Sequence, residues 1–287
     1  SGAPPWIRRV PAAGRHAHDL ARPVVTDAGW RRYESDPGIA AWARHAAGYA
    51  TDILAEPARA HWYRCRRTWF AGVDCLPNDE TGRLPGGPPL QGQGIGDLPG
   101  ELALHKAQVS AVFPGYPQAK EGESTAAARY RIKRDAAHVD GLLPVGPDRR
   151  RMIREPHAFI LGLPLTDAPP DASPLVVWEG SHRLMQEAFR SVLAPAPIET
   201  WSDIDLTGVY HAARRIAFER CRRVEVPAGP GEAVLLHPML LHGISPWRAK
   251  AGPPRIVAYF RPQLPTRRWL RIGEEPGHPF PPQDASQ

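Results

Sequence analysis

The chain has 287 residues, of which 42% are apolar and 23% are charged. This balance is typical of a globular protein and excludes wholesale disorder. The 36 basic residues outnumber the 30 acidic ones and give a net charge of +6. Because the basic residues are scattered in pairs and triplets, the excess charge does not indicate a dedicated nucleic-acid-binding surface.

The sequence carries no sign of a membrane segment or of export. No apolar run reaches the roughly 18 residues of a membrane span, and the first residues lack the basic-then-apolar pattern of a signal peptide. The 3 cysteines form no CxxC pair, and an odd number argues against a disulfide framework. We therefore expect a soluble protein in a reducing, cytoplasmic compartment, without a membrane partner.

The first hundred residues are expected to form helices and loops. Asp36 and Pro37 are typical of a helix start, and apolar residues at helical spacing follow them. Pro57 is expected to end that helix or to open a second one, which extends to Trp69. The segment 76–100 is polar and rich in proline and glycine, and is predicted to be a loop.

From about residue 104 the pattern changes to short apolar or alternating segments between turn residues, which is typical of a β-sandwich or barrel. Between about 183 and 222 the pattern becomes helical and predicts an insertion or lid. The Pro-rich chain after Pro265 is expected to lie along the surface. We expect strands at 108–113, 130–140, 158–165, 174–178, 233–241 and 255–261.

The segment His138-Val139-Asp140 lies at the end of one predicted strand. Since side chains alternate in a strand, His138 and Asp140 are expected on the same face. They would supply two of the three ligands of a 2-His-1-carboxylate site, which leaves open positions on Fe(II) for oxygen and substrate. Alone this pattern is weak, because such a pair also occurs on surfaces and in cores.

A third candidate ligand, His242, follows an apolar segment about a hundred residues later, and Arg255 begins the next predicted strand. A buried arginine there would be unfavourable unless it met an anion, and a guanidinium is suited to bind a carboxylate through two hydrogen bonds. The alternative interpretations are a hydrogen-bonded core histidine and an arginine at a solvent-exposed sheet edge.

In this order and spacing, the motifs resemble the phytanoyl-CoA dioxygenase-like branch of the Fe(II)/2-oxoglutarate-dependent oxygenases. The resemblance covers roughly residues 104–262. It is carried by His138-x-Asp140, Leu165-Thr166-Asp167-Ala168, Gly180-Ser181-His182 and His237-Pro238-x-Leu240-Leu241-His242-Gly243 followed by Arg255.

The resemblance implies a mainly β fold with flanking helices: a double-stranded β-helix (a jelly roll, as in cupins) backed by N-terminal helices. It implies a single dioxygenase domain spanning the whole chain. We expect a helical and loop region at 1–103, a jelly-roll core at 104–262 with the helical insertion at 183–222, and a Pro-rich tail at 263–287.

The resemblance also implies an oxidoreductase that uses Fe(II), O2 and 2-oxoglutarate to hydroxylate a small molecule while 2-oxoglutarate is converted to succinate. It assigns His138, Asp140 and His242 to the metal and to catalysis, and Arg255 to the C5 carboxylate of 2-oxoglutarate. Gln108 falls where many relatives place a polar co-substrate contact. Halogenating relatives lack the carboxylate of Asp140, so its presence favours hydroxylation or a related oxidation.

The chain departs from the family pattern at two positions. Glu179 stands where the family usually has proline before Gly-Ser-His, so this loop could bring a carboxylate to the site. Relatives often carry a hydroxyl two residues after the distal histidine, but Ile244 occupies that position here. The hydroxyl of the next residue, Ser245, is therefore a candidate contact for 2-oxoglutarate.

His237 lies five residues before His242 and so has the opposite strand parity; we expect it to pack or to support the site.

Three alternatives remain open from the sequence. An oxidative nucleic-acid demethylase would use the same iron chemistry, with Arg255, Arg261 and the basic charge as its features, but the dispersed arginines argue against it. A non-catalytic jelly-roll binding protein would not need the intact ligand set. A dioxygenase that uses no keto acid would not need Arg255.

A basic rim would suit an anionic small-molecule substrate.

Overall fold

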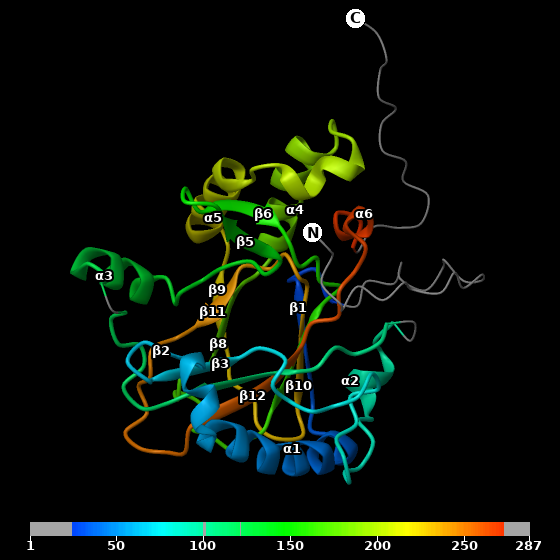
Figure 1. Ribbon diagram of the computed structural model, residues 1–287, viewed down its shortest axis with the longest axis vertical. Coiled ribbons are helices and arrows are strands. Elements are labelled where there is room, and N and C mark those ends of the chain that lie inside the picture. The colour runs from blue at the N-terminus through cyan, green and yellow to red at the C-terminus, as the bar shows by residue number, and fades with distance from the viewer. Residues whose placement is uncertain (1–24, 100–101, 121, 273–287) are drawn as a thin grey trace, which may run out of the picture.

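The computed structural model describes residues 25–99, 102–120 and 122–272 (Figure 1). Its largest element is a seven-stranded antiparallel sheet with the order β1-β10-β7-β12-β4-β3-β2. A second antiparallel sheet has the order β11-β8-β9. The strands of the large sheet are β1 (Trp30–Tyr33), β2 (Tyr63–Arg64), β3 (Trp69–Gly72), β4 (Gln108–Val112), β7 (Ile160–Pro164), β10 (Ala233–Leu236) and β12 (Arg255–Phe260). Those of the small sheet are β8 (Leu175–Trp178), β9 (Arg223–Val226) and β11 (His242–Ile244).

The two sheets face each other across an apolar interior. Ile160 and Leu236 from the large sheet pack in one cluster with Leu175 and Val177 from the small sheet. Successive side chains of a strand point to opposite faces, so the neighbouring residues of β7 and β10 point away from this interior. The arrangement is a jelly roll, as the sequence predicted.

The outer face of the large sheet is covered by helix α1 (Pro37–Ala55), which lies along the bottom of the view in Figure 1. Asp36 caps this helix by accepting hydrogen bonds from the backbone N–H groups of Gly38 and Ile39, and Pro37 occupies its first position. The buried Trp42 of α1 contacts Phe260 of β12, with ring centroids 5.7 Å apart. The predicted helix start is therefore confirmed, and its apolar face builds the main core.

The rest of the N-terminal region is less helical than expected. Pro57–Trp62 forms only a 3-10 helix, η2, after which the chain enters strands β2 and β3. The prediction of a second helix extending to Trp69 was wrong, because Trp69 pairs with Val112 in the large sheet. Strands β1 to β3 thus place part of the sheet before residue 104.

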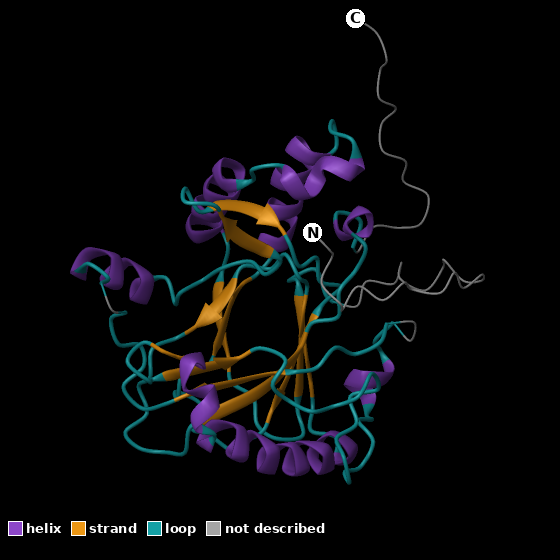
Figure 2. Ribbon diagram, in the orientation of Figure 1, coloured by secondary structure: helices purple, strands orange, loops and turns teal. Residues whose placement is uncertain are grey.

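A second group of helices lies at the other end of the sandwich, at the top of Figure 2. Its elements are α4 (Ser181–Leu193), η3 (Ile198–Asp203), α5 (Thr207–Arg220), α6 (Thr266–Trp269) and the hairpin of β5 (Leu142–Val145) with β6 (Arg150–Ile153). Helices α4, η3 and α5 occupy the segment in which the sequence pattern becomes helical. Trp269, however, is fully buried and stacks on Phe189 at 5.6 Å, so the chain just after Pro265 is part of the core. The remainder of the predicted tail, from residue 273, lies outside the described residues.

The predicted strand at 130–140 was also wrong. Ser124 caps helix α3 (Thr125–Lys133) by accepting a hydrogen bond from the N–H of Ala127, and the alanine-rich first turn favours the helix. Asp135 and Ala136 then adopt positive φ angles of 52°, which turn the chain toward the small sheet. A further short helix, α2 (Gln93–Gly96), lies in the predicted loop.

In the described part of the chain, no helix is long and apolar enough to cross a membrane.

Candidate active site

The segment that carries His138 is held against strand β11 by backbone hydrogen bonds. The N–H of His138 donates to the carbonyl of His242 at 2.8 Å, and the N–H of His242 donates to the carbonyl of His138 at 3.0 Å. Nearby, the N–H of Ile244 donates to the carbonyl of Asp135 at 2.9 Å. This isolated bridge, rather than a regular strand, brings together two segments that are a hundred residues apart.

The bridge requires glycine at position 243. A Cβ atom added there would lie 2.2 Å from the carbonyl oxygen of Asp135 and 3.1 Å from the backbone of Ala137. Real Cβ atoms do not approach a carbonyl oxygen this closely, so only a residue without a side chain lets the two segments approach. Gly243, which follows His242 in the sequence motif, is therefore needed so that the segment of His138 can pack closely against β11.

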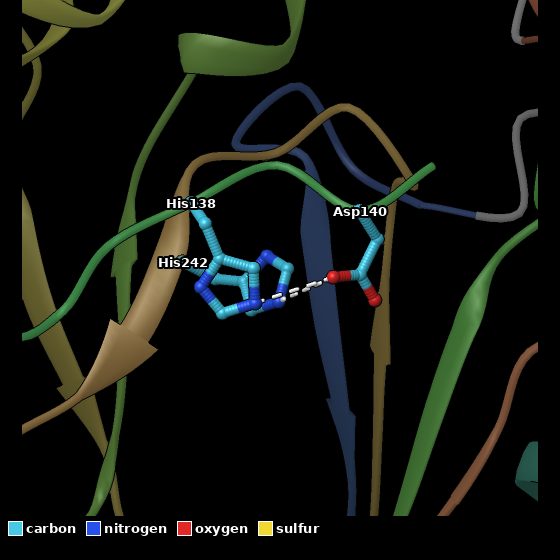
Figure 3. A group of neighbouring side chains, drawn as sticks. All are labelled: His138, Asp140 and His242. Atoms are coloured by element: carbon cyan, nitrogen blue, oxygen red, sulfur yellow. Dashed lines mark ion pairs between the residues drawn. The ribbon is translucent and has the colours of Figure 1, made fainter. Parts of the chain in front are cut away.

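His138, Asp140 and His242 point toward one another at this crossing, as Figure 3 shows. The Nε2 atoms of His138 and His242 lie 3.3 and 3.8 Å from Oδ1 of Asp140. One potential ligand atom from each residue lies within 4.8 Å of the other two. Asp140 and His242 are buried, whereas the side chain of His138 is half exposed.

The surroundings of both imidazoles leave Nε2 free to bind a metal ion. Nδ1 of His138 lies 3.2 Å from the carbonyl of Ala136, and Nδ1 of His242 lies 2.9 Å from the carbonyl of Leu240. A carbonyl accepts only, so it selects the tautomer with the proton on Nδ1. Burial, assisted by the charge of His138, lowers the pKa of His242 to about 4. A neutral imidazole is the form that binds metals.

Arg261 holds the third member of the cluster in place. Its Nη1 donates to Oδ2 of Asp140 at 3.0 Å, which leaves Oδ1 directed at the histidines. Burial alone would raise the pKa of Asp140, but the charge of Arg261 and the contact with His138 outweigh it and keep this pKa well below its usual range. Asp140 is therefore an anion at neutral pH, as a metal ligand must be.

Gln108 lies beside this ion pair. It begins strand β4, where it pairs with Tyr259 of β12, and its Oε1 accepts a hydrogen bond from Nη2 of Arg261. Both Gln108 and Tyr259 line the cavity next to the cluster. The ring of Tyr259 passes close over Gly162 of the neighbouring strand, where a Cβ atom would come within 2.9 Å of it. The large sheet thus places a polar side chain and an aromatic ring opposite the three candidate ligands.

The cluster opens into a cavity of about 670 Å³. Its wall combines the inner face of the large sheet, the loop of His138, the hairpin β5–β6, α3 and α5. A cavity of this size is typical of sites for small molecules. Basic side chains outnumber acidic ones in its wall: Lys106, Lys120, Arg131, Arg151, Arg214 and Arg261 face Asp74, Asp140 and Glu155.

Arg255 is the first residue of β12 and is not among the residues that line this cavity. It shares its strand face with Val257 and Tyr259 and pairs with Val112 of β4. Its Nη1 atom is buried and has no hydrogen-bond partner among the described residues. A buried guanidinium nitrogen without an acceptor is unfavourable, and an anionic ligand would supply the missing acceptor. This orphaned donor fits a carboxylate between the sheets.

The other polar residues singled out in the sequence do not line the cavity. Ser245 is fully buried, where its hydroxyl donates to the carbonyl of Pro246 and accepts from Nη1 of Arg248 at 3.1 Å. Glu179 accepts hydrogen bonds from Nε1 of Trp30 and from Nε of Arg222, which lowers the pKa of its carboxyl, so its carboxylate is directed away from the cluster.

His237 packs against His182, with ring centroids 4.8 Å apart and both residues buried. Nδ1 of His237 accepts from the N–H of Met239 at 3.1 Å. Burial lowers the pKa of His237 to about 3 and that of His182 to about 4, so both rings are neutral. His237 is not part of the three-residue cluster.

The sequence did not single out Arg261 as part of this site. In the sequence analysis, Arg261 was considered only as a feature of the nucleic-acid alternative. In the structure, its side chain donates hydrogen bonds to Asp140 and Gln108 inside the site. Its place on the same strand face as Arg255 was the one available signal. Nor did the sequence indicate that α5 and the β5–β6 hairpin form part of the cavity wall.

A jelly roll that presents two imidazoles and a carboxylate beside a large cavity is typical of mononuclear non-haem iron oxygenases. Residues 113–253 match the family model of phytanoyl-CoA dioxygenase (PhyH). The matched range contains all three residues of the cluster, while Arg255 follows just after it. The protein is an Fe(II)- and 2-oxoglutarate-dependent oxygenase, as its sequence motifs predicted.

The solved structures that match this chain share little sequence with it. The Fe-bound EctD from S. alaskensis is 16% identical, with a TM-score of 0.45 over 89% of this chain and 79% of that chain. HygX from Streptomyces hygroscopicus, with nickel and 2-oxoglutarate bound, is 14% identical, with a TM-score of 0.36 over 83% of each chain.

The carbocyclase SnoK from nogalamycin biosynthesis is 14% identical, with a TM-score of 0.32; the match covers 55% of this chain and only 49% of that chain. No curated protein matches the sequence. At these identities and TM-scores, the likeness does not identify a substrate.

Proposed function

We propose that the protein hydroxylates a small, anionic molecule and converts 2-oxoglutarate to succinate. In the overall reaction, one atom of O2 enters a C–H bond of the substrate as a hydroxyl, and the other enters succinate as CO2 leaves 2-oxoglutarate. The observation that carries the proposal is the cluster of His138, Asp140 and His242 at the wall of a cavity of about 670 Å³. Such a cavity has room for a co-substrate and a small molecule beside the metal.

In this proposal His138, Asp140 and His242 hold Fe(II). Two imidazoles and a carboxylate would leave coordination positions for 2-oxoglutarate and O2, and iron bound there would supply the oxidising chemistry. Arg261 fixes the orientation of Asp140 through its outer oxygen. Ligands held by neighbouring hydrogen bonds keep the metal geometry during the reaction.

Arg255 would bind the C5 carboxylate of 2-oxoglutarate, and its buried Nη1 without a partner supports this role. Gln108 would contact the co-substrate from the cavity wall, since it lies next to both Arg261 and Tyr259. Ser245 has less support as a contact, because its hydroxyl already interacts with Arg248.

We further infer that residues 1–287 form one dioxygenase domain with the jelly-roll core at 104–262. The contribution of β1 and β3 to the large sheet supports a single unit rather than a separate N-terminal part. A reducing, cytoplasmic location is supported by Cys65, Cys75 and Cys221, all of which are free thiols.

The first test is an anaerobic titration of the protein with Fe(II) and 2-oxoglutarate. A competent site gives a weak visible charge-transfer band, and His138→Ala should abolish it. His61→Ala, which removes an exposed histidine from η2, is the matched control and should leave the band unchanged. A wild-type protein without the band would identify a non-catalytic binding protein instead.

The second test is oxygen-dependent succinate release across a panel of small carboxylates and phosphate esters, with neutral analogues of similar size for comparison. We expect release above the background only with an anionic member of the panel, and none from His138→Ala. Equal stimulation by neutral analogues would contradict the anionic part of the proposal, while leaving the iron chemistry intact.

A further inference from the structure

Two arginines line the cavity where the helical insertion meets the β5–β6 hairpin. Arg151 lies on β6, and its backbone N–H donates to Oγ1 of Thr207 at 2.7 Å, while its carbonyl accepts from the N–H of Leu206 at 2.8 Å. These bonds fix β6 against the start of α5. Arg214 lies on α5, one turn beyond Tyr210. Both side chains are partly buried and both belong to the cavity wall.

Within the described ranges, neither arginine forms an ion pair. The one side-chain hydrogen bond of Arg151 is a long contact of 3.5 Å to the carbonyl of Leu142. Nε of Arg214 is buried and has no partner. The other two arginines of the wall are neutralised, Arg131 by Glu123 at 2.8 Å and Arg261 by Asp140.

The two guanidinium groups act on the same surroundings. The pKa of His211 is lowered first by burial and then by the charges of Arg214 and Arg151, and both charges also act on the Tyr210 hydroxyl. Partly buried like charges repel each other when no counterion lies between them, and a bound oxyanion removes this penalty. Neither guanidinium has a competing acid to release, so both are available to an anion in the cavity.

The helix that carries Arg214 also contacts the loop of the metal cluster. The Tyr210 hydroxyl interacts with the backbone of Val139, the residue between His138 and Asp140. The same helix thus connects the arginine pair to the loop that carries two of the candidate ligands. A group bound by the arginines would leave the rest of its molecule within the same cavity.

We propose that Arg151 and Arg214 together bind an oxyanion of the substrate, either a carboxylate or a phosphate, and so orient the rest of the molecule toward the metal cluster. The inference rests on the proposed function for the identity of the bound molecule, but the anion site itself does not. The insertion α4–α5 then determines specificity, because it supplies one of the two arginines. Arginine is suited to this purpose, since its planar group makes two parallel hydrogen bonds to either anion.

The test is a calorimetric titration of the metal-free protein with inorganic phosphate and, separately, with acetate. The wild type should bind at least one of these probes saturably, and Arg151→Ala and Arg214→Ala should each weaken that binding at least about tenfold. The two probes distinguish a phosphate-bearing substrate from a carboxylate. Arg150→Ala and Arg215→Ala remove the exposed neighbours in sequence and should leave the affinity within about twofold.

Further measurements distinguish a loss of the anion site from a loss of the co-substrate site and from misfolding. Arg255→Ala should leave intact the binding of phosphate and the part of acetate binding that depends on Arg151 and Arg214. Arg214→Lys should recover part of the affinity lost in Arg214→Ala, because it restores the charge. The variants of Arg150, Arg151, Arg214 and Arg215 should keep the wild-type melting temperature within a few degrees and should still give the visible band with Fe(II) and 2-oxoglutarate.

The inference is overturned if neither probe binds the wild type, if the control variants weaken binding as much as the paired ones, or if binding disappears only in Arg255→Ala. If the visible band is absent while phosphate or acetate still binds through Arg151 and Arg214, the proposed function fails and the anion site stands. If the band is present but the arginine variants bind like the wild type, the anion site fails and the proposed function stands.

Discussion

The substitution Gly243→Ala tests whether the metal cluster depends on the close crossing of two chain segments. The added Cβ would lie 2.2 Å from the carbonyl oxygen of Asp135. A carbon and a carbonyl oxygen in contact normally lie about 3.3 Å apart, so the segment must retreat by roughly 1 Å. His138 and Asp140 follow Asp135 closely, and they would move away from His242 together with it.

The expected effect on metal binding is large, because metal–ligand distances are held to within about 0.2 Å. We expect Fe(II) affinity to fall about 10–100-fold, as it does when a ligand loses its orientation. Overpacking of this kind also destabilises a fold by about 1–3 kcal/mol. The chain should still fold, because the main core around α1 lies on the far side of the large sheet.

The assay is an anaerobic Fe(II) titration followed by tryptophan fluorescence, with a thermal melt on the same samples. Gly48→Ala is the matched control, since nothing lies within 4 Å of the added atom and the residue is in helix α1. It should leave metal affinity unchanged and raise stability by about 0.5–1 kcal/mol. A folded Gly243→Ala protein with wild-type Fe(II) affinity would refute the argument that the crossing sets the ligand geometry.

Three further outcomes are expected. Arg261→Leu should weaken Fe(II) binding about 10–100-fold, because Asp140 loses the partner that orients it; unchanged affinity in a metal titration would exclude this positioning role. Arg255→Ala should raise the 2-oxoglutarate concentration needed for half-maximal succinate release at least about tenfold without changing Fe(II) affinity. If this concentration is the same in the variant and the wild type, Arg255 does not bind 2-oxoglutarate. Burial lowers the pKa of His182 to about 4 and that of His237 to about 3. Between these values and the usual pKa of about 6.5, the unfolded chain therefore binds protons that the folded chain does not. The stability of the fold is retained above about pH 6.5 and is lost as the pH falls toward 4. Urea unfolding should show this loss, with a smaller slope in His182→Gln; equal slopes would assign the pH dependence to other groups.

The resemblance of the sequence motifs to a known family was enough to predict the three candidate ligands. An HxD pair and a histidine before glycine are local patterns whose order along the chain is specific to one superfamily, so they could be recognised without coordinates. The strand β12 was also predictable, because its side chains alternate between the interior and the outer core. The faces of that strand placed Arg255 and Arg261 on the same side before any partner was known.

Local structure around the first motif could not be predicted in the same way. The segment Tyr130–Asp140 alternates like a strand, yet the cap at Ser124 and the alanines after it favour α3 over the first part. His138 then reaches His242 through a bridge outside any named strand, and this depends on a backbone turn at Asp135 and on Gly243. Periodicity describes regular elements, so it carries no information about such a crossing.

The sequence by itself determined the class of chemistry, because metal-ligand types and their order are properties of the chain. Only the tertiary structure decided how the ligands are held and what faces them. Arg261 donates a hydrogen bond to Asp140, which lies 121 residues earlier in the chain. Arg151 lines the cavity because β6 packs against the start of α5. Such contacts follow from sheet register and helix packing, which depend on the whole fold rather than on neighbouring residues.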